Sequence, residues 1–127
     1  MKQQHLLGLI CLSGLVAVAI GAFGAHGITS PQAKAWVETG SSQHMAHSLA
    51  LFACVWLQTQ GFSRARFAVP LFGLGILLFA GSLYALALGA PRAVAMAAPL
   101  GGLGFLSGWL CLAWACFSRK DTLDVPN

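Results

Sequence analysis

The chain has 127 residues, of which 57% are hydrophobic and 8% charged, and its formal net charge is +4. Soluble domains carry about 25% charged residues, so most of this surface must face lipid. The basic residues stand singly in short connections and form no basic patch, which argues against a nucleic-acid partner. This scatter is typical of a membrane protein, whose partner is the lipid bilayer.

The first apolar run covers residues 6–25 and predicts a membrane span of about 20 residues. Lys2 precedes the run and small residues close it, as in a secretory signal peptide. The run is longer than the 7–15 apolar residues of a typical signal peptide, so a membrane span is the favoured interpretation.

The connection at residues 26–42 predicts a short amphipathic helix at the membrane interface. Ser30 is a natural N-cap, Pro31 suits the first helical position, and Gly40 is a natural C-terminal stop. A helix over residues 31–39 would place Trp36 at the interface as an anchor.

Three further spans follow at about residues 43–61, 67–88 and 93–117. The sequence therefore predicts an all-α, single-domain, integral membrane four-helix bundle with short connections. One side of the membrane would carry five basic residues and the other only two, which places both termini in the cytoplasm of a multi-pass protein of the bacterial inner membrane. The two sets are Lys2, Arg64, Arg66, Arg119 and Lys120 against Lys34 and Arg92.

Small residues recur at helical spacing in three of the predicted spans, which favours close helix packing in lipid. The three stripes are Gly14, Ala17, Gly21 and Ala25; Gly81, Ala85 and Gly89; and Gly101, Gly104 and Gly108. All four cysteines lie inside apolar runs without a C-x-x-C pair, and we expect them to behave as small hydrophobic residues.

Several short motifs carry a family resemblance over nearly the whole chain. They are GAFGAHG at residues 21–27, HSLAL at 47–51, FAGSLY at 79–84, and PLGG at 99–102 with Gly-Trp at 108–109. In this order and spacing the chain resembles the YgdD-like family of small four-helix bacterial inner-membrane proteins (domain of unknown function 423). The resemblance implies four spans in an inner membrane and brings no activity, substrate or cofactor.

Polar side chains from three spans are predicted to gather in the outer half of the bilayer. They are His26, His47, Ser82 and Tyr84. One interpretation is structural, with these groups bonding one another or the backbone to hold the helices together. The alternatives are a pocket for a small molecule, a lipid or a quinone, and a metal or haem site with His26, His44 and His47 as weak candidate ligands, because His44 and His47 are three residues apart and could share a helix face.

The sequence offers no set of catalytic residues. No acidic residue lies inside a predicted span, which removes paired carboxylates and a carboxylate proton relay. We therefore expect no enzyme, and no cofactor is named by the sequence. The favoured function is a non-catalytic accessory, assembly or scaffold subunit, as a homo-oligomer or within a larger membrane complex. The alternative is a small-molecule, lipid or quinone binder or carrier, or a metal- or haem-binding protein, that uses the histidine and tyrosine cluster.

Overall fold

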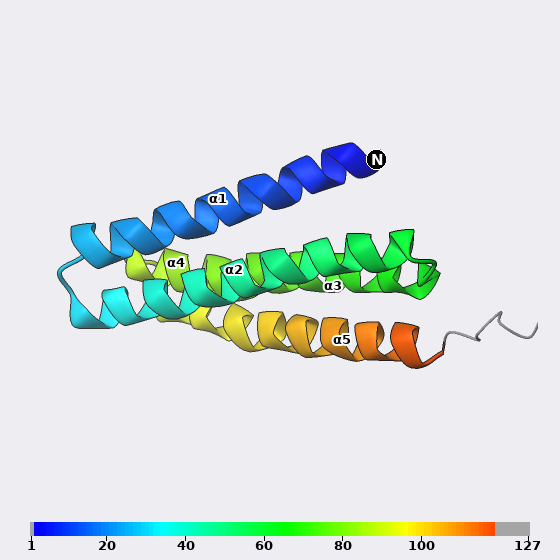
Figure 1. Cartoon of the computed structure of the whole chain (residues 1–127). Helices are drawn as coiled ribbons and strands as arrows, with labels where there is room; N and C mark the ends of the chain where they lie inside the picture. Colours follow the sequence, from blue (N-terminus) through cyan, green and yellow to red (C-terminus); the bar gives the residue numbers. More distant parts are fainter. Residues whose placement is uncertain (1, 119–127) are drawn as a thin grey trace, which may run out of the picture.

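The computed structural model describes residues 2–118, and its regular elements there are all helical (Figure 1). Helix α1 runs over Gln3–Gly27 and helix α2 over Pro31–Thr59. A third rod follows, built from η1 (Ser63–Phe67), α3 (Ala68–Gly75), the π-helical turn η2 (Ile76–Ala80) and α4 (Gly81–Ala87). A fourth rod consists of η3 (Arg92–Met96) and α5 (Ala97–Phe117). Short connections make consecutive rods antiparallel, which confirms the predicted all-α membrane bundle.

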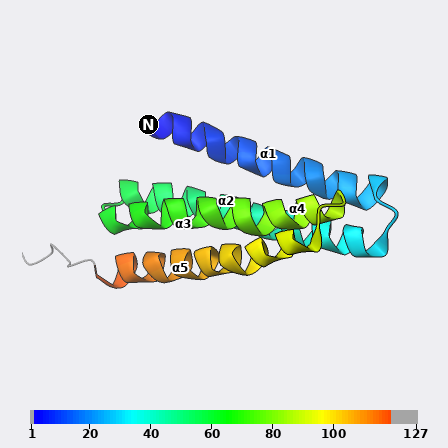
Figure 2. The same ribbon diagram turned by 180° about the vertical axis from the view of Figure 1, so that it is seen from behind.

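Within residues 2–118, three of the rods are long and apolar enough to cross a membrane. They are Gln3–Gly27, Ser63–Ala87 and Arg92–Phe117. Helix α2 is the more polar fourth rod, and it lies between α1 on one side and the α3–α4 and α5 rods on the other (Figures 1 and 2). Its polar residues His44, His47 and Ser48 are buried in this central position.

The separate interfacial helix that the sequence predicts is instead the first part of α2. Its start is as expected, since the Ser30 hydroxyl accepts a hydrogen bond from the Ala33 amide at 3.3 Å and Pro31 is the first helical residue. The predicted stop at Gly40 is wrong, because the helix continues through it without a break. A Cβ atom at this position would lie 2.8 Å from the Tyr84 ring. Gly40 therefore allows close packing on α4. The glycines with positive φ in the described chain are instead Gly61 and Gly89, which lie in the connections.

Helix α1 is attached to the bundle along α2 and splays away from it toward its N-terminal end (Figures 1 and 2). The N-terminal end of α1 and the last turn of α5 lie at the same end of the bundle (Figure 1). Lys2, Arg64 and Arg66 share this end, whereas Lys34 and Arg92 belong to the opposite one.

Two of the three predicted small-residue stripes make close contacts. In α5, a Cβ at Gly104 would lie 3.0 Å from the Leu71 carbonyl oxygen, and one at Gly108 would lie 2.6 Å from the Phe72 ring. Gly21 likewise faces Ser41 across the α1–α2 contact. The stripe at Gly81 is different, because a Cβ there would meet no described atom within 4 Å. A side chain at Gly81 would therefore point into open space rather than against a neighbouring helix of the described chain.

The cysteines do not share one environment. Cys54 is completely buried in the core, whereas Cys11 and Cys116 are exposed on the outside of the bundle. All four are free thiols. Cys54 therefore packs as a small hydrophobic residue in the core, and Cys11 and Cys116 face the surroundings of the bundle.

Candidate functional site

His44 is the centre of a hydrogen-bond network that joins three helices. Its Nε2 atom lies 3.0 Å from the Ser13 hydroxyl of α1, and its Nδ1 atom lies 3.0 Å from the Tyr84 hydroxyl of α4. Ser13 also lies 2.7 Å from the Ser48 hydroxyl, one turn further along α2. Ser48 donates to the His44 carbonyl oxygen at 2.9 Å.

For a neutral His44 imidazole, the direction of every bond in this network follows by elimination. Ser48 uses its only hydroxyl hydrogen on the His44 carbonyl, so it accepts from Ser13. Ser13 has then spent its own hydrogen and must accept from Nε2–H of His44. The other ring nitrogen, Nδ1, carries a lone pair and accepts from the Tyr84 hydroxyl. A neutral His44 in this network is therefore the Nε2–H tautomer.

His47 has the opposite tautomer and points to other helices. Its Nδ1–H donates to the Gln43 carbonyl oxygen at 2.7 Å, and its Nε2 accepts from the Trp109 indole N–H at 3.2 Å. The imidazole also stacks on the Phe105 ring with centroids 3.5 Å apart and an interplanar angle of 7°. His44 therefore faces α1 and α4, while His47 faces α5, although the two residues are only three positions apart.

The four residues of the predicted polar cluster have different partners. His26 is exposed at the last turn of α1, and Ser82 donates to the Phe79 carbonyl oxygen of the π-helical turn at 2.9 Å. Tyr84 bonds His44, and His47 bonds Trp109. Among residues 2–118, no three His, Cys, Asp or Glu side chains stand close enough to hold a metal ion.

His47 lies further along its helix than the sequence predicts. The sequence places it about one turn inside its span, because that span is predicted to begin at residue 43. Since α2 begins at Pro31, His47 lies two residues from Met45, the middle residue of the helix. At 1.5 Å per residue this is roughly 3 Å from the midpoint of a rod about 43 Å long.

Three partners of the histidines are absent from the predicted cluster: Ser13, Ser48 and Trp109. Trp109 carries a sequence signal, because it lies too deep in its span for the interfacial position that tryptophan prefers. The bond to His47 accounts for that position. Ser48 stands inside the HSLAL motif, while Ser13 lies in an ordinary apolar run and gives no comparable signal.

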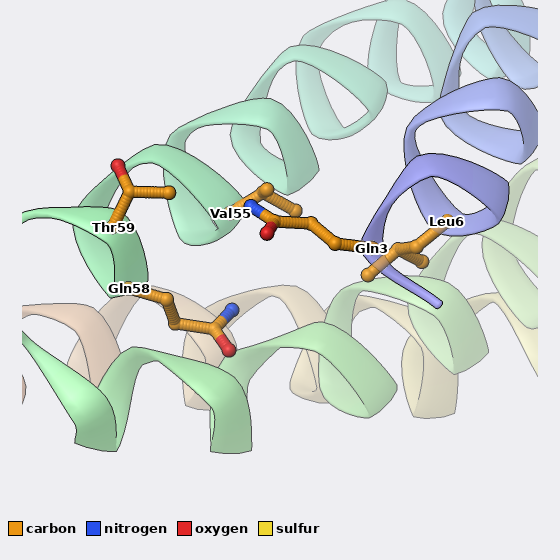
Figure 3. Close-up of a pocket in the computed structure, with 5 residues that line it drawn as sticks. All are labelled: Gln3, Leu6, Val55, Gln58 and Thr59. Carbon is orange, nitrogen blue, oxygen red and sulfur yellow. The ribbon is translucent and has the colours of Figure 1, made fainter. Parts of the chain in front are cut away.

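A separate pocket of about 270 Å³ opens where α1 splays from α2 (Figure 3). Gln3 reaches from the first turn of α1 toward Val55 of α2, with Leu6 beside it. Gln58 and Thr59 close the pocket from the last turn of α2, and both bond backbone carbonyls of their own helix, those of Cys54 and Trp56. The pocket lies at the end of the bundle, where polar side chains can reach water.

Together, the apolar rods and the buried polar network define a multi-helix integral membrane protein whose central helix is held by side-chain hydrogen bonds. The family model described as "Protein of unknown function (DUF423)" matches residues 20–102. The chain belongs to this family, the UPF0382 membrane proteins.

Relatives from distant bacteria match most of the chain. A UPF0382 membrane protein of Haemophilus influenzae is 40% identical over 124 residues, covering 95% of this chain and 99% of the relative. The inner membrane protein YgdD of Escherichia coli K12 is 35% identical over 113 residues, 86% of each chain. The membrane protein YwdK of Bacillus subtilis is 36% identical over 120 residues, 91% of this chain and 96% of the relative. No solved structure matches the chain.

Proposed function

We propose that this protein is a non-catalytic accessory or scaffold subunit of the bacterial inner membrane. The observation that carries the proposal is the state of the two buried histidines. All four of their ring nitrogens take part in hydrogen bonds within the protein, and each bond has an assigned direction. A metal ion, a haem or a reacting substrate would have to break one of these bonds to reach an imidazole.

The network also contains no acidic side chain that could form an ion pair with a histidine or take a proton from it. Glu38 is the one acidic residue among residues 2–118, and it lies in the first third of α2, outside the network. Serine and tyrosine hydroxyls then serve as neutral donors and acceptors between helices. In membranes such bonds contribute about 0.6–2 kcal/mol each to helix association.

The proposal includes four spans with both termini in the cytoplasm. Helix α2 lies beside three rods that are apolar enough to cross, and its length of about 43 Å covers the same thickness. The end of the bundle that carries Lys2, Arg64 and Arg66 would face the cytoplasm, as the excess of basic residues favours. The inner-membrane location of the Escherichia coli relative, as its name states, supports this location.

Native purification from a bacterial membrane in mild detergent tests the accessory function. We expect native mass spectrometry to give one complex whose mass equals a whole number of these chains plus a partner protein at fixed stoichiometry. A tag on that partner should recover this chain in the same ratio. Recovery of the chain alone, together with stoichiometric iron, copper or haem absorbance, would overturn the proposal and favour a metal or haem protein.

A further inference from the structure

A groove of about 520 Å³ lies between α2, η2 and α5 and is not part of the histidine network. This volume falls within the range of about 300–1,000 Å³ typical of small-molecule sites. The lining has no charged residue and is apolar except for Gln43, His47 and Trp109. Its remaining walls are Phe79, Pro99, Gly102, Leu103, Phe105 and Leu106.

Gln43 is the polar residue of this groove that the protein leaves unsatisfied. Its backbone carbonyl accepts from His47, but within residues 2–118 its half-buried side-chain amide has no hydrogen-bond partner. The two other polar groups bond each other, since the Trp109 indole donates to His47. An amide in hydrocarbon without a partner is costly, so Gln43 needs a partner from outside the chain.

The depth of Gln43 restricts what that partner can be. In the proposed four-span topology the middle of α2 lies near the middle of the bilayer, and Gln43 lies two residues, roughly 3 Å, from the middle residue of α2. Phospholipid head groups sit at the edge of a hydrocarbon layer about 30 Å thick, so their polar atoms stay about 15 Å away. A molecule that reaches Gln43 must carry its hydrogen-bonding group into the membrane interior.

The shape of the groove favours a small molecule over a second copy of the chain. A pair of chains with its two-fold axis through the groove would place one groove against the other and leave both hollow. The floor at Gly102 is open, because a Cβ there would meet no described atom within 4 Å. Trp109 is half-exposed and provides aromatic surface beside this open floor, with the buried Phe105 behind it.

We propose that this groove binds a neutral, ring-bearing isoprenoid lipid of the quinone class. The Gln43 amide would donate to a ring carbonyl of the quinone or accept from a hydroxyl of the quinol, which places the head group near the membrane centre. The ring would lie against Trp109, and the tail would leave past Pro99 and Leu103. This is a binding site with no redox step, and it adds a ligand to the subunit whether or not a partner protein is found.

Quenching of Trp109 fluorescence by decylubiquinone tests this site in the full chain. The measurement uses a background in which the other tryptophans, Trp36, Trp56 and Trp114, are replaced by phenylalanine. We expect saturable quenching in the parent. Gly102→Leu should lower the affinity at least tenfold, because its side chain fills the groove. Gly73→Leu is the matched control, because its added side chain also meets open space but lies on α3, outside the groove. It should change the affinity less than twofold.

Gln43→Leu keeps the size of the side chain and removes the amide, and we expect it to weaken binding about tenfold. Unchanged melting temperatures would show that the variants fold. Equal quenching in the parent and in Gly102→Leu would overturn the site. If Gly102→Leu weakens quinone binding but Gln43→Leu does not, the proposal is also overturned, because the groove would then bind the hydrocarbon part of the ligand alone. Gly102→Leu that releases a co-purified protein and leaves quinone binding intact would identify a protein contact instead.

Discussion

Tyr84 and His44 lie 40 positions apart in the sequence and are joined by a 3.0 Å hydrogen bond from the tyrosine hydroxyl to Nδ1 of the imidazole. Ser13 bonds the opposite nitrogen of the same ring. One neutral imidazole therefore connects α1, α2 and α4. Because α1 packs mainly on α2, the His44 ring and the Ser13–Ser48 bond together attach α1 to the centre of the bundle.

Ser13→Ala should loosen α1. The change removes the acceptor of His44 Nε2–H and the donor to Ser48, so a buried N–H loses its partner. We expect a loss of about 1–2 kcal/mol in the free energy of unfolding, seen as a lower melting temperature in detergent. Ser42→Ala on the exposed face of α2 is the matched control and should have little effect. Equal melting temperatures for the two variants would show that the network contributes nothing to helix attachment.

Gly108→Leu should be strongly destabilising, since its Cβ would lie 2.6 Å from the Phe72 ring in the core. Forcing α5 away from α3 should lower the free energy of unfolding by about 1–3 kcal/mol or more. Gly73→Leu adds the same side chain in open space and should change it by less than about 0.5 kcal/mol. Thermal unfolding in detergent measures both variants. Similar tolerance of the two changes would mean that the glycines reflect composition rather than packing.

The proposed topology is tested by single cysteines in a background without the four native ones. Thr29 in the α1–α2 connection and Ala90 before η3 lie at one end of the bundle, and Ser63 lies at the other. A membrane-impermeant thiol reagent should label Cys at positions 29 and 90 in spheroplasts, and Cys at position 63 only after lysis. Labelling at position 63 alone would reverse the orientation. Opposite accessibility of positions 29 and 90 would contradict four spans.

The sequence predicts the helical rods well because long apolar runs and their connections are strong local signals. Ser30 and Pro31 identify the start of α2, and the packing of Gly104 and Gly108 follows from their spacing. Gly40 misleads, because glycine favours both a helix end and a close helix contact, and local sequence does not tell the two apart.

The polar site is harder to predict, since its partners depend on how four helices rotate against one another. His44 and His47 are neighbours on one helix, yet their rings diverge toward α4 and α5. Ser13 enters the network from an apolar run that gives no hint of it. The sequence predicts a span that begins at residue 43, with His47 about one turn inside it, whereas α2 begins at Pro31 and His47 lies two residues from its middle residue.

The tautomers of His44 and His47 test the central claim that both buried imidazoles are locked in structural hydrogen bonds. The direct measurement is a ¹⁵N NMR spectrum of the detergent-solubilised full chain with labelled histidine, assigned with His44→Gln and His47→Gln. We predict a protonated Nε2 and an unprotonated Nδ1 for His44, and the reverse for His47. The same tautomer for both rings, or a shift of either ring on addition of zinc or haem, would contradict the account.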